Sequence, residues 1–143
     1  MSQSLYIIIV GCGRLGGVLA NRLSGLGHSV VVIDRSEAAF NKLTAEFSGF
    51  QLVGDAVELA VLRQAKTHQA HYLFATTKED NVNLMVAQVA KTAFNVPTVI
   101  ARVFDPGREV IYKEFGVTTI SPTKLAASVF LQVLQSPATE QSV

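Results

Sequence analysis

The apolar run Tyr6–Val10 leads directly into a glycine-rich turn at residues 11–16, which reads Gly-Cys-Gly-Arg-Leu-Gly. The next apolar run ends at Asp34, 18 positions after Gly16. This order predicts a strand, a tight turn and a helix whose backbone amides approach a phosphate, with a carboxylate at the neighbouring strand tip for ribose hydroxyls. A tight turn without a ligand is the alternative. Because the pattern follows a strand and opens a helix, it favours a nucleotide site.

Apolar runs alternate with helical patterns along the whole chain, which is typical of a parallel sheet covered on both faces. We therefore predict an α/β fold of the Rossmann type, a doubly wound six-stranded parallel sheet with helices on both faces. The expected strands are Leu5–Val10, Ser29–Asp34, Phe50–Val53, Tyr72–Thr76, Thr98–Val103 and Val117–Ile120. Between them, helical spacing predicts two core-facing stripes. These are Glu37, Phe40, Leu43 and Phe47, and Val82, Met85, Val86, Val89 and Ala90.

Composition narrows the possible functions. The 143 residues are 49% hydrophobic and 16% charged, which suits one domain with a substantial core. A net charge of +1 argues against nucleic acid as a partner. No apolar run approaches the ~20 residues that span a bilayer, and residues 1–4 lack the basic start of a secretion signal, so we expect a cytoplasmic chain. The single cysteine, Cys12, excludes an internal disulfide and a cysteine-rich metal site, and we predict no metal.

The last predicted helix, residues 125–134, contains no charged residue, and its apolar residues cover more than one face. A helix that only covered its own sheet would show a polar outer face. Deep burial is the alternative, but it is hard to arrange at the end of so small a domain. Because exposed apolar patches usually mark interfaces, we expect contact with another subunit. We place the domain at residues 1–135 and a polar tail at residues 136–143.

Charged residues near the glycine turn suggest how a nucleotide would be held. Arg14 lies within the turn, where its planar guanidinium could reach a phosphate. Asp34 would accept hydrogen bonds from the ribose and repel a 2′-phosphate, which disfavours NADP. Arg35 could tolerate a 2′-phosphate, stack on the adenine or point to water.

Three later segments are expected at the same edge of the sheet. Asp55 and Ala56 follow the third strand, where the carboxylate could accept from an adenine amino group or cap the next helix. Thr76 and Thr77 follow the fourth strand and face the crevice where strand order reverses. Arg102, the one charge in the fifth strand, needs a phosphate or a neighbouring carboxylate as its partner.

Together these motifs resemble a known regulatory family. They are Gly-x-Gly-Arg-x-Gly-Gly, Val-Ile-Asp, Gly-Asp-Ala, Ala-Thr-Thr-Lys-Glu-Asp-Asn-Val-Asn and Ile-Ala-Arg-Val, in this order from residue 11 to residue 103. From about Tyr6 to Leu134 the chain resembles the RCK N-terminal, or TrkA-N, domain of Trk and Ktr potassium uptake systems.

The resemblance implies a six-stranded Rossmann domain without catalytic activity. It would bind NAD(H) or an adenine nucleotide (ATP, ADP or AMP) and gate a pore-forming membrane subunit through a dimer-based, octameric ring. It also implies a location at the inner face of the membrane, and a last helix that crosses to the neighbouring subunit. By position, residues 11–15 would hold the phosphates, Asp34 the ribose, Asp55 and Ala56 the adenine, and Thr77 and Arg102 the far part of the ligand. The full set of expected binding residues is Gly11, Cys12, Gly13, Arg14, Leu15, Gly16, Asp34, Arg35, Asp55, Ala56, Thr76, Thr77 and Arg102.

Two departures from the family pattern and two other functions stay open. Many members continue into a second regulatory domain, so this chain is either a short subunit that works with a separate partner or part of a longer protein. Thr123 stands where some ATP-responsive members carry an acidic residue that helps to bind a divalent cation. The alternative functions are a regulatory domain of a cation/proton antiporter and a small NAD-dependent oxidoreductase. The three histidines (His28, His68 and His71) argue against the enzyme, because they are expected as surface or turn residues at the amino ends of strands, away from the nucleotide site.

Overall fold

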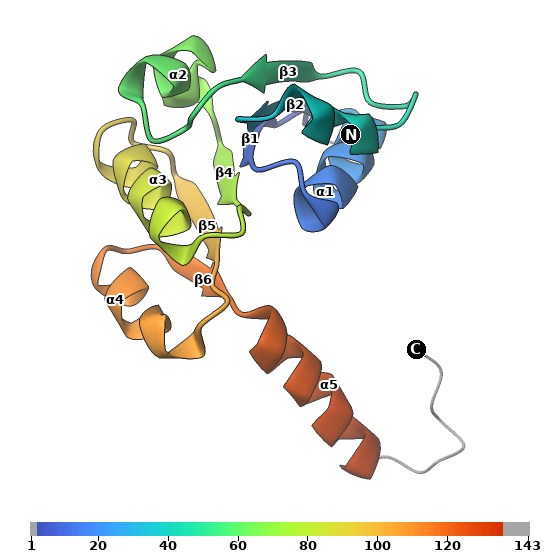
Figure 1. The fold of residues 1–143 in the computed structure, drawn as a ribbon, viewed down its shortest axis with the longest axis vertical. Helices are drawn as coiled ribbons and strands as arrows, with labels where there is room; N and C mark the ends of the chain where they lie inside the picture. Colours follow the sequence, from blue (N-terminus) through green and yellow to red (C-terminus); the bar gives the residue numbers. More distant parts are fainter. Residues whose placement is uncertain (1–2, 136–143) are drawn as a thin grey trace.

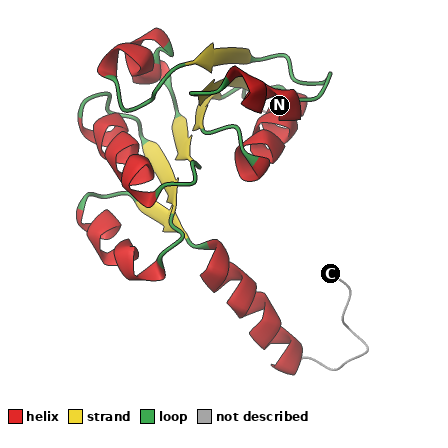
Figure 2. Ribbon diagram, in the orientation of Figure 1, coloured by secondary structure: helices red, strands yellow, loops and turns green. Residues whose placement is uncertain are grey.

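The computed structural model describes residues 3–135, in which one parallel sheet carries helices on both faces (Figures 1 and 2). Strand order is β3-β2-β1-β4-β5-β6, so the predicted Rossmann-type fold is confirmed. The strands are β1 Tyr6–Val10, β2 Ser29–Asp34, β3 Phe50–Val53, β4 Tyr72–Ala75, β5 Thr98–Arg102 and β6 Thr118–Ile120. Each predicted strand is therefore present, with ends that differ by no more than one residue.

The helical elements occupy the connections between the strands. The α-helices are α1 Arg14–Gly25, α2 Leu59–Gln64, α3 Asp80–Thr92, α4 Glu109–Glu114 and α5 Pro122–Gln135. Short 3₁₀ helices are η1 Glu37–Lys42, η2 Thr67–Gln69 and η3 Pro106–Arg108.

The strands bury side chains on both faces, because successive residues of a strand point to opposite sides. On one face, Ile7 and Ile9 pack with α1 and with Phe40 of η1. On the other face, Ile8 and Val10 belong to a larger core that includes α2, α3 and α4. Near-continuous Val and Ile runs in β1 and β2 are the sequence consequence of this two-sided burial.

The structure corrects the helical stripe predicted across residues 37–47. Only η1 is helical there, and Leu43 is already extended, with φ −78° and ψ 136°. Two hydrogen bonds to the Asn21 side chain hold the chain in this shape: Asn21 Nδ2 donates to Lys42 O at 3.1 Å, and Thr44 N donates to Asn21 Oδ1 at 3.0 Å. These contacts take backbone groups that a longer helix would have paired within itself, although Phe40, Leu43 and Phe47 still reach the core.

The stripe predicted on α3 is only partly right. Val86 and Ala90 are fully buried, but Met85 is half exposed. The buried face is rotated toward Asn83 and Ala87, which are also fully buried, because the Asn83 side chain finds hydrogen-bond partners inside the fold. A polar core residue of this kind is not visible to a purely apolar pattern.

Helix α5 extends away from the rest of the domain (Figure 1). None of its residues is buried, and Phe130 and Leu134 are 76% and 82% exposed. The deep burial considered for this helix is therefore absent from the described residues, while the expected subunit contact stays a prediction. No helix in the described part of the chain combines the length and the apolar character needed to cross a membrane. The predicted tail at residues 136–143 lies outside the described residues.

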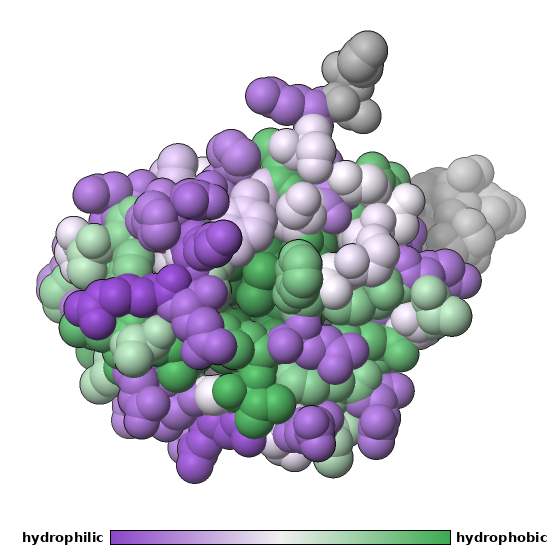
Figure 3. All heavy atoms as spheres, turned by 90° about the horizontal axis from the view of Figure 1, so that it is seen from above, coloured by the Kyte–Doolittle hydropathy of each residue, from purple (hydrophilic) through white to green (hydrophobic). Residues whose placement is uncertain are grey.

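The edge strand β3 also exposes apolar side chains. Phe50 is 75% exposed and Val53 is 50% exposed. Figure 3 looks down on the end of the molecule that carries α2 and β3 and shows apolar residues around a hollow, bordered by hydrophilic ones. The strand is only four residues long, which limits the unpaired edge that it presents.

Candidate functional site

A cleft of about 830 Å³ opens at the carboxyl ends of the strands. It lies where the strand order reverses, since β1 is flanked by β2 on one side and β4 on the other. Ligands of open α/β sheets bind at this position, and the volume falls within the range of small-molecule sites. The cleft extends from Asp55, after β3, to Phe104, after β5.

The glycine turn forms the floor of the cleft, and two of its glycines are required by geometry. Gly11 has φ +101°, a conformation that other residues rarely adopt, and its N–H donates to Ile33 O at 2.8 Å. A Cβ on Gly16 would lie 1.8 Å from Gly11 O, so only glycine lets α1 start this close to the turn. Gly13 has open space around it, which leaves its backbone accessible from the cleft.

Asp34 anchors the turn from the tip of β2. Its Oδ2 accepts from Cys12 N at 2.7 Å, and its Oδ1 accepts from Ser36 N at 2.9 Å. Each carboxylate oxygen keeps a further lone pair for a ligand hydroxyl. Cys12 is fully buried, and burial together with the nearby Asp34 raises the pKa of its thiol, which suits a packing residue rather than a reactive one.

The threonines after β4 are more strongly tied into the fold than expected. The Thr76 hydroxyl is buried and donates to Val10 O and Gly11 O at 3.1 and 3.0 Å. The Thr77 hydroxyl donates to Asn83 Oδ1 at 2.7 Å, and Thr77 N donates to the same oxygen at 2.9 Å. Both side chains therefore shape the cleft wall through internal hydrogen bonds.

Within the fold, Arg102 is paired with backbone carbonyl oxygens. Its Nη2 donates to Thr76 O and Thr77 O, while Nε is buried without a hydrogen-bond partner among the described residues. Burial lowers the pKa of the guanidinium, and Asp80 partly opposes this effect. The ring of Phe104 lies against the guanidinium, with the ring centroid 4.6 Å from Cζ. Arg102 is thus compensated by carbonyl oxygens and an aromatic face.

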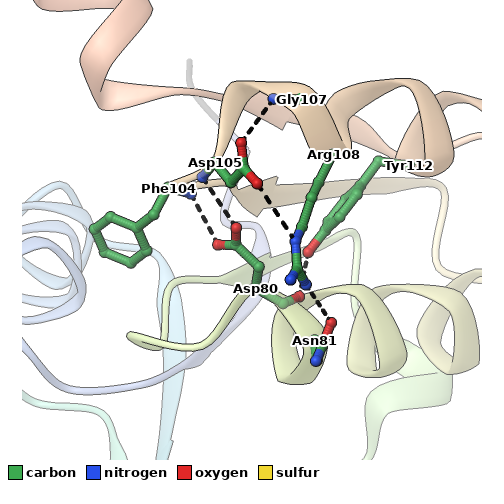
Figure 4. Close-up of polar contacts among 7 residues, drawn as sticks. All are labelled: Asp80, Asn81, Phe104, Asp105, Gly107, Arg108 and Tyr112. Carbon is green, nitrogen blue, oxygen red and sulfur yellow. Dashed lines mark hydrogen bonds and ion pairs between the residues drawn. The ribbon is translucent and has the colours of Figure 1, made fainter.

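The loop after β5 is fixed to the start of α3 by Asp80 (Figure 4). The Asp80 carboxylate accepts from Phe104 N at 2.8 Å and from Asp105 N at 3.0 Å. The Tyr112 hydroxyl donates to Asp80 O, and burial raises the pKa of this tyrosine to about 12. The wall of the cleft that carries Phe104 is therefore held to the fold by buried and charge-assisted hydrogen bonds.

The structure brings most of the predicted site residues to one cleft. The members that line it are Gly11, Cys12, Gly13, Arg14, Asp34, Arg35, Asp55, Ala56, Thr76, Thr77 and Arg102. Leu15 and Gly16, in the first turn of α1, are not part of the lining. Asp55 accepts from Val57 N at 3.1 Å and so closes a local turn, whereas α2 begins only at Leu59.

Sequence reasoning missed several lining residues. These are chiefly Lys42, Val57, Lys78, Glu79, Val82 and Phe104. Lys78 and Phe104 follow predicted strand ends within three residues, a signal that could have been used. Lys42 lies eight residues beyond β2 and reaches the cleft only because η1 folds back over α1. Five basic residues line the cleft against three acidic ones, which favours an anionic ligand. Among residues 3–135, no three metal-ligating side chains gather in one place.

Solved structures share this fold. The TrkA-N domain of the inner membrane protein YbaL from Escherichia coli superposes with a TM-score of 0.82 at 21% identity, covering 94% of this chain and 99% of that one. The GsuK channel bound to NAD superposes with a TM-score of 0.78 at 22% identity, covering 94% of this chain and 24% of that one. The Kef C-terminal domain from Shewanella denitrificans in its AMP-bound form superposes with a TM-score of 0.77 at 23% identity, covering 94% of this chain and 84% of that one.

Sequence comparison identifies the family. The chain is 36% identical over 130 residues to the Trk system potassium uptake protein TrkA of Streptomyces coelicolor, covering 91% of this chain and 58% of the relative. A TrkA homologue from Methanothermobacter thermautotrophicus is 30% identical over 134 residues, covering 93% and 62%. The chain thus spans about three-fifths of the length of these relatives. The profile of the TrkA-N domain matches residues 7–122. The chain therefore belongs to the TrkA-N domain family.

Proposed function

We propose that the cleft binds NAD(H) or an adenine nucleotide (ATP, ADP or AMP) as a regulatory effector. The observation that carries this proposal is the Asp34 carboxylate, which contacts Cys12 N in the glycine turn and still has lone pairs for ribose hydroxyls. The excess of basic residues around the opening favours a phosphorylated ligand. Solved neighbours of this fold have been obtained with NAD, ADP and AMP bound.

The geometry supports a definite order of ligand groups along the cleft. The adenine would lie near Asp55 and Ala56, and the ribose would lie over Asp34. The phosphates would meet the turn of residues 11–15 at the start of α1 through the backbone amides of residues 13–15, because Gly11 N and Cys12 N already donate to Ile33 O and Asp34 Oδ2. Arg14 and Arg35 would lie beside them. This order runs from the end of β3 to the end of β1.

Calorimetric titration of the purified chain with NADH, NAD, ATP, ADP and AMP tests the assignment. Asp34→Ala should weaken every ribose-containing ligand at least about tenfold, because a hydrogen bond to a charged group contributes ~1.5–3 kcal/mol. Glu46→Ala is the matched control, since the Glu46 carboxylate also accepts a hydrogen bond, from the Thr44 hydroxyl, but lies outside this cleft. No binding to any of the five ligands would refute the nucleotide proposal, and unchanged affinity in Asp34→Ala would refute the role of Asp34.

We further propose that the domain is a non-catalytic regulator of a potassium uptake system. The named relatives are Trk system proteins, and binding of the effector would shift the balance between two states of an assembly that contacts a pore-forming membrane subunit. The domain would then act at the inner face of the membrane, with the second regulatory domain supplied by the rest of the chain or by a separate subunit. Co-purification of the natural protein with a membrane subunit tests this role. Oxidation of NADH by the purified chain alone, with a common electron acceptor, would instead support the oxidoreductase.

Self-association through α5 is the third part of the proposal. Helix α1 packs against β1 and β2, which leaves Phe74 of β4, Ile100 of β5 and Ile120 of β6 only partly covered. The exposed apolar side of α5 would cover such surface on a second copy, because a helix and a sheet face bury one another's apolar residues. Light scattering should give a dimer or larger ring, and Phe130→Gln should shift it toward the monomer. A wild-type monomer at micromolar concentration would contradict this arrangement.

A further inference from the structure

The far end of the cleft carries an aromatic ring in a fixed position. Phe104 lines the cleft and is 44% exposed, so part of its ring is available to a ligand. Its backbone N–H donates to Asp80, and the ring points away from the polar cluster of Asp105, Arg108 and Tyr112 (Figure 4). Because the loop is already fixed, a ligand can contact the ring without first ordering the loop.

Part of the Arg102 guanidinium at this end of the cleft is already used within the fold. Its Nη2 is already directed to the carbonyl oxygens of Thr76 and Thr77, and its Nε is buried. Those carbonyl oxygens would repel a phosphate that approached the same donors. One face of the guanidinium lies against Phe104, so this end of the cleft presents an aromatic surface beside the remaining N–H groups of Arg102.

The distance along the sheet limits which ligands can reach Phe104. The glycine turn follows β1, whereas Phe104 follows β5, two strands further along the sheet. At ~4.8 Å per strand, the two positions are about 10 Å apart. AMP or ADP, with its ribose at Asp34 and its phosphates at the turn, carries no second ring that could reach this point. A dinucleotide continues past the turn, and its second ring lies beyond the phosphates.

We propose that Phe104 is a specificity-determining residue that stacks on the second, non-adenine ring of a bound nicotinamide adenine dinucleotide. The inference rests on the nucleotide-binding function proposed above and deepens it. The Phe104 ring contributes to binding of the dinucleotide and does not touch AMP or ADP. Asp80 is a positioning residue in this arrangement, since it fixes the backbone from which the ring projects.

The test compares NADH and ADP on the same variants. Phe104→Leu should weaken NADH binding about three- to tenfold, the range of a single aromatic stacking contact, and leave ADP within about twofold of wild type. Phe104→Tyr retains the ring and should retain NADH affinity. Phe115→Leu is the matched control: Phe115 is 43% exposed but lies outside the cleft, so this change should affect neither ligand. NADH can be followed by the fluorescence anisotropy of its nicotinamide, ADP by calorimetry, and thermal melting checks that each variant is folded.

The outcomes separate this inference from the proposed function. Selective loss of NADH affinity in Phe104→Leu, rescued in Phe104→Tyr, supports stacking. Equal losses for NADH and ADP, no loss for either, or wild-type protein that binds ADP but not NADH would each overturn the role of Phe104 while nucleotide binding stands. Wild-type protein that binds neither ligand would overturn both proposals.

Discussion

Replacement of Gly16 by alanine is the sharpest mechanical test of the glycine turn. The new Cβ would lie 1.8 Å from Gly11 O and 2.9 Å from Thr76 Oγ1. Because normal contact requires about 3.2 Å, the start of α1 and the turn must separate by roughly 1.4 Å. Overpacking of this kind costs typically ~1–3 kcal/mol, and both neighbours are held by hydrogen bonds, so we expect the upper end. Because alanine is more favourable than glycine in a helix by about 1 kcal/mol, the expected net loss in the free energy of unfolding is about 2 kcal/mol.

Urea denaturation followed by circular dichroism measures this loss. Gly25→Ala, in the last turn of the same helix, is the matched control, because nothing lies within 4 Å of a Cβ there. That variant should be as stable as wild type or more stable by up to ~1 kcal/mol. Gly16→Ala should also lose nucleotide affinity, since the shift displaces Gly11 and the amides beside it. A Gly16→Ala protein within about 0.5 kcal/mol of wild type would show that the turn and helix are not held as closely as the structure indicates.

Other changes probe the cleft and the link to α5. Gly13→Ala should leave the free energy of unfolding within ~0.5 kcal/mol of wild type, because a Cβ there meets open space. The same change should weaken ADP binding measured by calorimetry, because the methyl group stands where a phosphate approaches, and wild-type ADP affinity would contradict this. Asn83→Ala should cost about 3 kcal/mol in urea denaturation, since the buried amide makes four hydrogen bonds to its surroundings, and a loss below ~1 kcal/mol would contradict their importance. Hydrogen bonds, first from Lys124 and then from Thr119, lower the pKa of Glu109 from its ordinary 4.5. A lowered pKa in the folded state gives stability that is present above the ordinary value and is lost as the pH falls through the folded-state pKa. Stability should therefore decline on acidification below about pH 4.5, and Lys124→Met should flatten this decline; an unchanged pH profile in that variant would refute the ion pair's role.

Local chemistry explains why the centre of the site could be predicted. The glycine turn, Asp34 and the strands on either side form a continuous segment, and the residue types needed there follow from backbone sterics and from the chemistry of phosphate and ribose. The strands were equally predictable, because burial on both faces demands unbroken Val and Ile runs. The glycine turn and the strands are therefore determined by residues that are close together in the sequence.

The features that escaped prediction depend on tertiary contacts. Lys42 enters the cleft because η1 folds back over α1, where the Asn21 side chain binds the backbone of Lys42 and Thr44. Asn83 rotates the buried face of α3 because the loop after β4 and the end of β5 supply its partners. The Arg102 guanidinium donates to the carbonyl oxygens of Thr76 and Thr77, which the sequence did not indicate as partners. In each case a polar side chain binds backbone from a distant segment, and spacing along the chain carries no record of that contact.

Hydrogen exchange with and without saturating NADH locates the bound nucleotide on the chain. We expect added protection at residues 11–16 and 76–79, where the backbone borders the cleft at the carboxyl ends of the strands. A second cleft, lined by Tyr6, His28 and Lys66, opens at the opposite edge of the sheet and serves as an internal control. Protection confined to that edge, or no protection at all, would contradict a nucleotide-sensing role for the site between the glycine turn and Asp34.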